Sequence, residues 1–239
     1  MKERSVPPSP RPDTRTDPLA VAAARALELV NDGSTIGVGA GNASFCFLRL
    51  LADRVAHGLR VEVVPASEQT AELAEQLGIP VSEPRTGIDI TFDGADEVSP
   101  ELDLVKGYGG ALVRERIVAA ASGSQIIIVG PEKLVPVLGS RGRLPVEVVP
   151  FALAPCCERL AALGLRPTLR WSTDGAFLTD NCNVILDCAV GPIAAPRALD
   201  AAIRAVPGVV DTGLFLGMAT KVLIGNGDGL QELTREGRR

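Results

Sequence analysis

The chain has 239 residues, of which 46% are hydrophobic and 22% charged, enough for one or two domains with a sizeable core. Its net charge of -5 offers no basic surface for nucleic acid, and an aromatic content of 3% leaves few rings on which bases could stack. No apolar run approaches the length needed to span a membrane.

The N-terminal stretch is charged, rich in proline and without the apolar core of a signal peptide. We therefore expect a disordered tail over residues 1–17 and a cytoplasmic protein. The five cysteines lack paired spacing, which predicts neither a disulfide framework nor a zinc site. The single histidine, His57, is expected at a solvated surface position.

The first predicted elements are a helix over residues 18–31, a strand over 34–38, a glycine loop over 39–43 and a helix over 44–56. This order presents backbone amides and a helix N-terminus to an anion. Asn42 or Ser44 stands where a dinucleotide fingerprint needs its third glycine, and the GK[ST] ending of a P-loop is missing. The loop therefore indicates either a small anion or sugar site or a tight turn without a ligand.

Strands and helices continue to alternate up to residue 130. Strands are predicted over residues 59–65, 80–83, 88–92 and 124–130, and helices after residue 67 and over 111–120. Ser67 or Glu68 is expected either to cap its helix or to lie near a ligand. The alternation predicts a mainly parallel, Rossmann-like sheet that is covered on both faces, with ligands at the carboxyl ends of its strands.

The segment 88–120 contains the residues most suited to chemistry. Asp93 and Asp96 follow a strand, Lys106 precedes the glycines 107, 109 and 110, and Glu115 lies near the start of a helix. A single Asp after a strand is usually a turn former. However, the loop at Gly39, the two Asp residues and Lys133 all lie just beyond strand ends, so they should converge. This convergence predicts a site for proton transfer on a small polyhydroxy substrate.

The pattern changes near residue 145, where the predicted order becomes β-α-β-β-α-β, the order of a ferredoxin-like α+β sandwich. We expect this smaller domain over residues 145–215. Residues 220–229 are then predicted to return as a strand to the first sheet, and 235–239 to form a frayed tail. Lys221 is expected at an exposed edge rather than at the rim of the site. The Rossmann-like domain would therefore comprise residues 18–144 together with 216–239.

The central segment resembles ribose-5-phosphate isomerase of the A type. Residues 93–97 read DGADE and residues 106–116 read KGYGGALVRER, close to the family's DGADE and KGGGGAL.REK. GVGAGNAS, SEQT, LPVEVVP, TDNCNVILD and PGVVDTGLF also resemble family motifs. The resemblance extends from about Pro18 to Gly229.

The resemblance implies interconversion of ribose 5-phosphate and ribulose 5-phosphate through an enediolate. Glu115 matches the family's proton acceptor, Lys106 a substrate contact that stabilises oxyanion charge, and Asp93 and Asp96 sugar-binding acids, with Asp93 assisting ring opening. Lys133 matches a further substrate contact. The resemblance requires no metal or cofactor and implies a homodimer or homotetramer. The substrate-binding set that it predicts is Ala40, Gly41, Asn42, Ala43, Asp93, Gly94, Ala95, Asp96, Lys106, Gly107, Tyr108, Gly109 and Lys133.

Three departures from the family pattern concern the substrate. The phosphate loop TGST is replaced by residues 40–43, AGNA; the lysine expected on the first helix is absent near Leu19 or Ala20; and Tyr108 places a ring where the substrate should approach. These departures leave open an isomerase for a pentose altered at C5. A non-catalytic sugar-phosphate sensor is a second alternative, which the retained acids and lysine disfavour. The broken glycine fingerprint disfavours a dehydrogenase.

Overall fold

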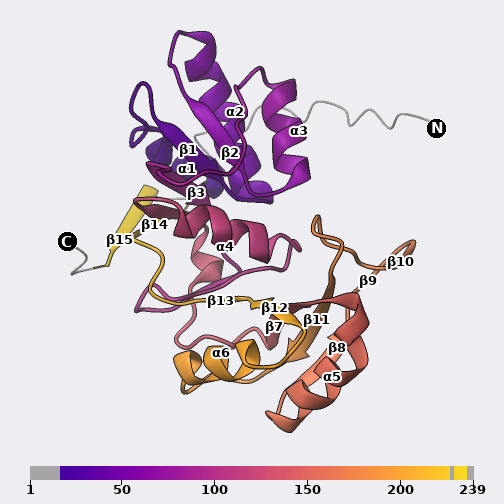
Figure 1. The fold of residues 1–239 in the computed structure, drawn as a ribbon. Coiled ribbons are helices and arrows are strands. Elements are labelled where there is room, and N and C mark those ends of the chain that lie inside the picture. Colours follow the sequence, from indigo (N-terminus) through magenta and orange to yellow (C-terminus); the bar gives the residue numbers. More distant parts are fainter. Residues whose placement is uncertain (1–16, 227–228, 236–239) are drawn as a thin grey trace.

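The computed structural model describes residues 17–226 and 229–235. Most of the expected N-terminal tail and of the frayed C-terminal tail therefore lies outside the described residues. The elements fall into a large sheet with its helices and a smaller antiparallel sheet with two further helices (Figure 1).

The large sheet has six strands in the order β15-β14-β6-β3-β1-β2. Its first five strands in sequence are parallel, and β15 is antiparallel to β14. The mainly parallel sheet predicted from the alternation is thus confirmed. The strands are β1 (Thr35–Val38), β2 (Glu62–Pro65), β3 (Ile90–Asp93), β6 (Gln125–Val129), β14 (Lys221–Asn226) and β15 (Gly229–Thr234).

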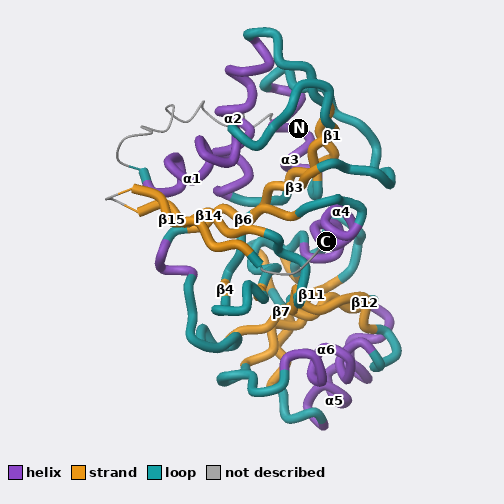
Figure 2. Tube along the Cα trace, turned by 90° about the vertical axis from the view of Figure 1, so that its left-hand side faces the viewer, coloured by secondary structure: helices purple, strands orange, loops and turns teal. Residues whose placement is uncertain are grey.

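Helices cover both faces of this sheet. One core joins α1 (Pro18–Leu27), α2 (Asn42–Ala56) and α3 (Glu68–Gln76) to one face, whereas α4 (Leu112–Ala120) lies on the other (Figure 2). The packing of α1 against β14 is so close that a Cβ atom at Gly225 would lie 1.7 Å from the Pro18 carbonyl oxygen. A glycine is therefore required at that position of β14.

A second, four-stranded antiparallel sheet has the order β12-β7-β11-β8. Its elements follow one another as β-α-β-β-α-β, and the predicted ferredoxin-like order is confirmed. The elements are β7 (Arg143–Val148), α5 (Leu153–Ala162), β8 (Arg166–Leu169), β11 (Val184–Ala189), α6 (Pro196–Arg204) and β12 (Val209–Thr212). The assignment of residues 145–215 to a separate domain stays a prediction.

Short elements connect the two sheets. A three-stranded sheet, β13-β5-β4, joins β4 (Glu97–Val98), β5 (Leu104–Val105) and β13 (Leu214–Phe215). The segment GVVDTGLF, whose pattern predicts one strand at the end of the smaller domain, is divided in two, because β12 pairs with β7 and β13 pairs with β5. The remaining elements are η1 (Pro131–Lys133), η2 (Pro150–Ala152) and the hairpin of β9 (Trp171–Ser172) and β10 (Gly175–Ala176).

The structure corrects several local expectations. The first helix ends at Leu27 rather than residue 31, and the strand expected at 80–83 is a single bridge between Val81 and Val63. β15 was not expected, and because it covers β14, Lys221 does not lie on an edge strand. Its Nζ instead lies 2.7 Å from an Oε2 of Glu232 on β15.

His57 is exposed, as expected. Within the described part of the chain, no helix is long and apolar enough to cross a membrane.

Candidate active site

The carboxyl ends of β1, β3 and β6 bring three loops together. The chain runs from β1 to β2 on one side and then returns to β3 on the other, so the sheet order reverses between β1 and β3. Such a switch point is where ligands bind in open parallel sheets. A cavity of about 350 Å³ lies there. It is lined by Leu19, Ala40, Gly41, Asn42, Ala43, Gly94, Ala95, Asp96, Lys106, Gly107, Gly109, Glu115, Ile128, Val129, Gly130, Glu132 and Lys133.

A buried lysine joins two carboxylates at one side of this cavity. Lys106 Nζ lies 2.9 Å from an oxygen of Asp93 and 3.1 Å from an oxygen of Glu115. It also donates a hydrogen bond of 2.7 Å to the Gly94 carbonyl. All three ionisable side chains are at most 6% exposed. Lys106 and Glu115 therefore line the cavity, and the fully buried Asp93 pairs with the same lysine behind them.

Burial governs the proton affinities of the three groups. Burial raises the pKa of Glu115 to about 7, with a further contribution from the charge of Asp93, and Lys106 opposes this increase. The pKa of Asp93 is also raised, chiefly by burial. Burial lowers the pKa of Lys106, but the charges of Asp93 and Glu115 outweigh this effect, so that pKa lies above its ordinary value. Glu115 is thereby suited to exchange a proton near neutral pH while Lys106 stays charged.

The loop after β1 is fitted tightly around Asp93. A Cβ atom at Gly39 would lie 1.8 Å from an oxygen of Asp93, so no side chain fits at that position. The buried hydroxyl of Thr70 donates to the Gly39 carbonyl at 2.8 Å. Ser67 accepts a 3.0 Å hydrogen bond from the Thr70 amide and caps α3. Ser67 thus takes the first of the two roles expected for it.

The loop after Lys106 has three glycines among its four residues, and it contacts both sheets. The Lys106 amide donates to the Gly213 carbonyl at 2.9 Å, and the Tyr108 amide donates to an oxygen of Asp96 at 2.9 Å. Gly107 and Gly110 have φ values of 101° and 95°, which favour glycine.

The ring of Tyr108 lies elsewhere than expected. Its hydroxyl donates to the Arg143 carbonyl at 3.1 Å, and the Arg143 guanidinium lies 3.9 Å from the ring centroid. The ring packs against the hydrophobic core of the second sheet and does not line the cavity. The expectation of a ring at the substrate is therefore corrected: Tyr108 contributes its backbone to the site and its side chain to the second sheet.

The opposite side of the cavity presents the N-terminus of α2. Gly41, with φ of 89°, is the N-cap of this helix, and Asn42 and Ala43 occupy its first turn. A helix N-terminus of this kind is a favourable place for an anion. Lys133 also lines the cavity, as does Leu19 of α1, the position near which the resemblance placed a lysine.

Most of the predicted site residues converge as expected. Asp93 differs, because it is fully buried beneath Lys106 and does not itself line the cavity. Several lining residues went unpredicted: Leu19, Ile128, Val129, Gly130 and Glu132. Gly130 and Glu132 carried a signal, since they lie between the end of a predicted strand and Lys133. The signal for Leu19 came from the family resemblance, which places a lysine near it, whereas the residues alone gave none because tertiary packing brings α1 to the cavity.

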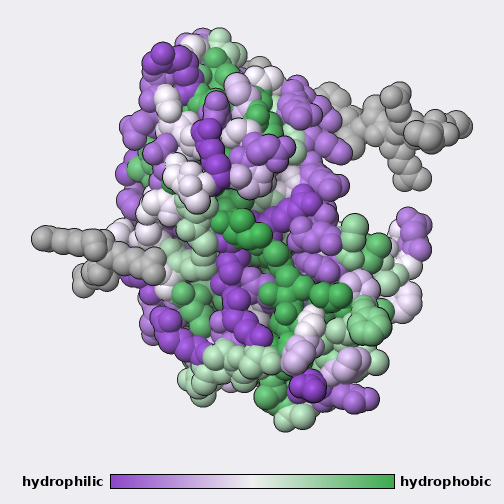
Figure 3. Space-filling view, viewed as in Figure 1, coloured by the Kyte–Doolittle hydropathy of each residue, from purple (hydrophilic) through white to green (hydrophobic). Residues whose placement is uncertain are grey.

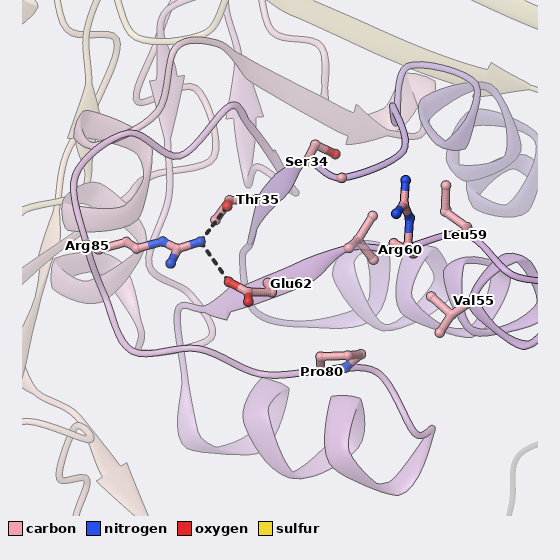
Figure 4. Close-up of a pocket in the computed structure, with 10 residues that line it drawn as sticks. Ser34, Thr35, Val55, Leu59, Arg60, Glu62, Pro80 and Arg85 are labelled. Atoms are coloured by element: carbon pink, nitrogen blue, oxygen red, sulfur yellow. Dashed lines mark hydrogen bonds and ion pairs between the residues drawn. The ribbon is translucent and has the colours of Figure 1, made fainter.

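A larger cavity of about 530 Å³ lies near the opposite ends of β1 and β2 (Figure 4). Its two arginines already have acidic partners, since Arg85 bonds to Glu62 at 2.7 Å and Arg60 pairs with Asp32. This cavity lacks the buried acid and lysine of the first one. In the described residues, no cluster of three or more His, Cys, Asp or Glu side chains is arranged to hold a metal ion.

Comparisons with known proteins agree with this geometry. The family described as ribose 5-phosphate isomerase A (phosphoriboisomerase A) matches residues 62–229. Ribose-5-phosphate isomerase A of Roseiflexus castenholzii is 51% identical over 89% of this chain and 93% of its own length, and that of Gloeobacter violaceus is 50% identical over 89% and 94%. The solved ribose 5-phosphate isomerase from Plasmodium falciparum superimposes with a TM-score of 0.88 at 34% identity, covering 92% of this chain and 98% of that one. The chain belongs to the ribose 5-phosphate isomerase A family.

Proposed function

We propose that this protein interconverts ribose 5-phosphate and ribulose 5-phosphate, with Glu115 as the base. One observation carries the proposal: the buried carboxylate of Glu115 lines the cavity and lies 3.1 Å from the Lys106 ammonium group. An aldose–ketose isomerisation needs such a pair, because one group must take a proton and return it while a second stabilises the negative charge formed in between.

In the proposed reaction, Glu115 carries one proton from C2 of the sugar to C1. In the open-chain aldose, Glu115 removes the proton on C2, and the electrons of that C–H bond form the C1–C2 double bond of an enediolate. Glu115 then returns the proton to C1, while a proton passes from the oxygen on C2 to the oxygen on C1. The carbonyl group thereby moves from C1 to C2, with no net gain or loss of atoms or electrons.

Lys106 is placed to stabilise the enediolate oxygens. Its charge persists because Asp93 lies 2.9 Å away, and it is held in a site with little access to water. Asp93 therefore contributes by keeping Lys106 charged. Its part in ring opening stays a prediction. Asp96, which lines the cavity, is the carboxylate that we assign to the sugar hydroxyls.

The phosphate is assigned to the N-terminus of α2 and to Lys133. Amide groups and a helix N-terminus bind phosphate without side-chain hydroxyls, so replacement of TGST by AGNA does not remove this site. The isomerase for a C5-altered pentose, considered from the sequence, is not favoured, because relatives about 50% identical over most of the chain are named ribose-5-phosphate isomerase A. The same relatives disfavour a non-catalytic sensor.

A substrate panel tests the proposal. Purified protein is incubated with ribose 5-phosphate, ribose and 5-modified riboses, and ketose formation is followed. We expect ketose from ribose 5-phosphate with a kcat/KM in the enzyme range of about 10⁴–10⁸ M⁻¹s⁻¹. In D₂O, deuterium should enter the product at C1. The proposal fails if ribose 5-phosphate is not converted, or if another pentose is converted far better.

We also propose a cytoplasmic homodimer or homotetramer. Support comes from large apolar side chains on the surface, including Ile117, Val149, Phe151 and Val210, with Phe151 96% exposed. Hydrophobic surface is also visible in the middle and lower parts of the face in Figure 3. Surfaces of this kind often mark protein interfaces. Light scattering coupled to gel filtration measures the oligomeric state, and a monomeric mass at micromolar concentration would contradict the proposal.

A further inference from the structure

One arginine of the smaller part of the fold, Arg170, bonds to the backbone of the loop that follows Lys106. Arg170 lies between β8 and β9, and its Nη1 donates to the carbonyl oxygens of Gly107 and Tyr108 at 3.0 and 3.1 Å. On its other side it donates from Nε and Nη2 to the two carboxylate oxygens of Asp187, the first at 2.8 Å. The Arg170 side chain is 11% exposed. One guanidinium thus bridges β11 and two successive backbone carbonyls.

Phe177, which follows the hairpin of β9 and β10, supports the other end of the loop at Gly110. Phe177 packs at Gly110, where a Cβ atom would lie 2.4 Å from its ring, and the Arg170 guanidinium lies 5.6 Å from the centroid of that ring. Arginine suits this position because its planar group offers several fixed donors, so it can hold Asp187 and the loop at once. A lysine carries the same charge but lacks the planar arrangement of several N–H donors.

The loop needs external support because of its composition. Glycine loses more conformational freedom on ordering than any other residue, and three of the four residues from 107 to 110 are glycines. Gly107 and Gly109 line the cavity directly after Lys106. Arg170 holds the carbonyl groups of residues 107 and 108. The Gly109 amide is a separate donor, and it has no hydrogen-bond partner within the described part of the chain.

We propose that Arg170 is a positioning residue for the isomerisation: oriented by Asp187, it fixes the glycine loop and thereby the place of Lys106 and of the backbone facing the substrate. The proposal rests on the proposed function of this site. Arg170 does not line the cavity, so its effect passes through the loop.

Three variants test this role. Arg170→Gln removes the guanidinium group and its charge, whereas Arg170→Lys keeps the charge but removes the planar set of donors. The double variant Arg170→Met with Asp187→Leu removes both charges, which avoids leaving an unpaired buried carboxylate. Arg235→Gln is the matched control, because Arg235 also pairs with a half-buried Asp, Asp103, and also donates to a backbone carbonyl, but does not touch the cavity.

We expect Arg170→Gln and the double variant to lose about 10- to 100-fold in kcat on ribose 5-phosphate with a smaller change in KM, since a misplacement of about 1 Å has such effects. Arg170→Lys should lose nearly as much. Arg235→Gln should keep the wild-type kcat. If Arg170→Gln does not fold, the double variant carries the test, because neither Arg170 nor Asp187 is left without its ionic partner, and Arg143, which also faces Asp187 at 3.5 Å, is 40% exposed to water.

A pH profile separates positioning from stability. Lys106 lowers the pKa of Glu115, so a displaced Lys106 should move the acidic limb of kcat/KM to higher pH in the Arg170 variants but not in Arg235→Gln. A folded double variant with wild-type kcat and an unmoved limb overturns the inference. An inactive wild-type protein would instead refute the proposed function, so the two failures are distinguishable.

Discussion

At the scale of single residues, the site depends on burial of charge. Glu115, Asp93 and Lys106 bring two negative charges and one positive charge into a place from which water is largely excluded. Such an arrangement costs stability, because burial disfavours the charged forms. It also raises the pKa of Glu115 to about 7, close to neutral pH.

Replacing Glu115 with Gln should lower kcat by about 10²–10⁴-fold, because an amide cannot accept the C2 proton. In the wild type, kcat/KM should rise with pH through about 7 as Glu115 ionises. Steady-state rates across pH 5–9 test both expectations. Near wild-type turnover in the variant would remove Glu115 from the mechanism.

The same variant has a stability consequence with a defined sign. The pKa of Glu115 is raised from 4.5 to about 7 in the folded protein, so this residue stabilises the fold below pH 4.5 and that contribution is lost as pH rises through 7. At pH 8 the Gln variant should therefore unfold at the same or a higher temperature than the wild type. Calorimetry at pH 5 and pH 8 gives the comparison.

Changing Lys106 to Ala, or Asp93 to Asn, should lower kcat more than it raises KM. The contact of Lys106 with the substrate strengthens as negative charge develops, and Asp93 helps keep that lysine charged. Lys106→Ala should also destabilise the fold by about 3–5 kcal/mol, the usual cost of leaving buried charge unpaired. If both variants changed KM alone, Lys106 and Asp93 would be uniform binding groups.

At the scale of elements, the loops at the carboxyl ends of the strands are shaped by contacts that sequence reveals only in part. The turn after β3 and the start of α4 were predictable, because strand alternation, glycines and the family motifs are local signals. The direction of the Tyr108 ring was not, since it is set by Arg143 on another sheet. Arg170 was missed for the same reason: the three residues to which its side chain donates lie 17 or more positions away in the chain.

A matched pair of glycine substitutions tests the fit of the loop after β1. Gly39→Ala should reduce activity strongly, because its Cβ would meet the Asp93 carboxylate and push it away from Lys106. Gly191→Ala is the control, since a Cβ there meets nothing within 4 Å. Activity and melting temperature are measured for both. Equal activity in the two variants would show that Asp93 can move without harm.

At the scale of the whole molecule, the large sheet is closed by the last part of the chain. β14 pairs in parallel with β6, and β15 adds an edge strand that the sequence did not predict, because GLQELT has little apolar alternation. Glu232 of β15 pairs with Arg25 of α1 at 2.6 Å and with Lys221 of β14. The hairpin thus binds the first helix to the last parallel strand.

Ending the chain after Asn226 should lower the melting temperature by several degrees, because the ladder to β15 and both ion pairs of Glu232 are lost. Glu232→Gln is the milder comparison, since partly exposed ion pairs contribute only about 0.2–1 kcal/mol each. Differential scanning calorimetry measures both. A truncated protein as stable as Glu232→Gln would mean that the strand itself contributes nothing.

The closeness of α1 to β14 also bears on how the protein is made. The Pro18 carbonyl fits against Gly225, so the first helix docks on a strand that the ribosome synthesises much later than the helix itself. During translation α1 lacks this packing partner until β14 has been made. The cavity wall to which Leu19 belongs therefore cannot be completed until β14 has left the ribosome. A nascent chain arrested before residue 221 should therefore have no isomerase activity, however long it is given to fold.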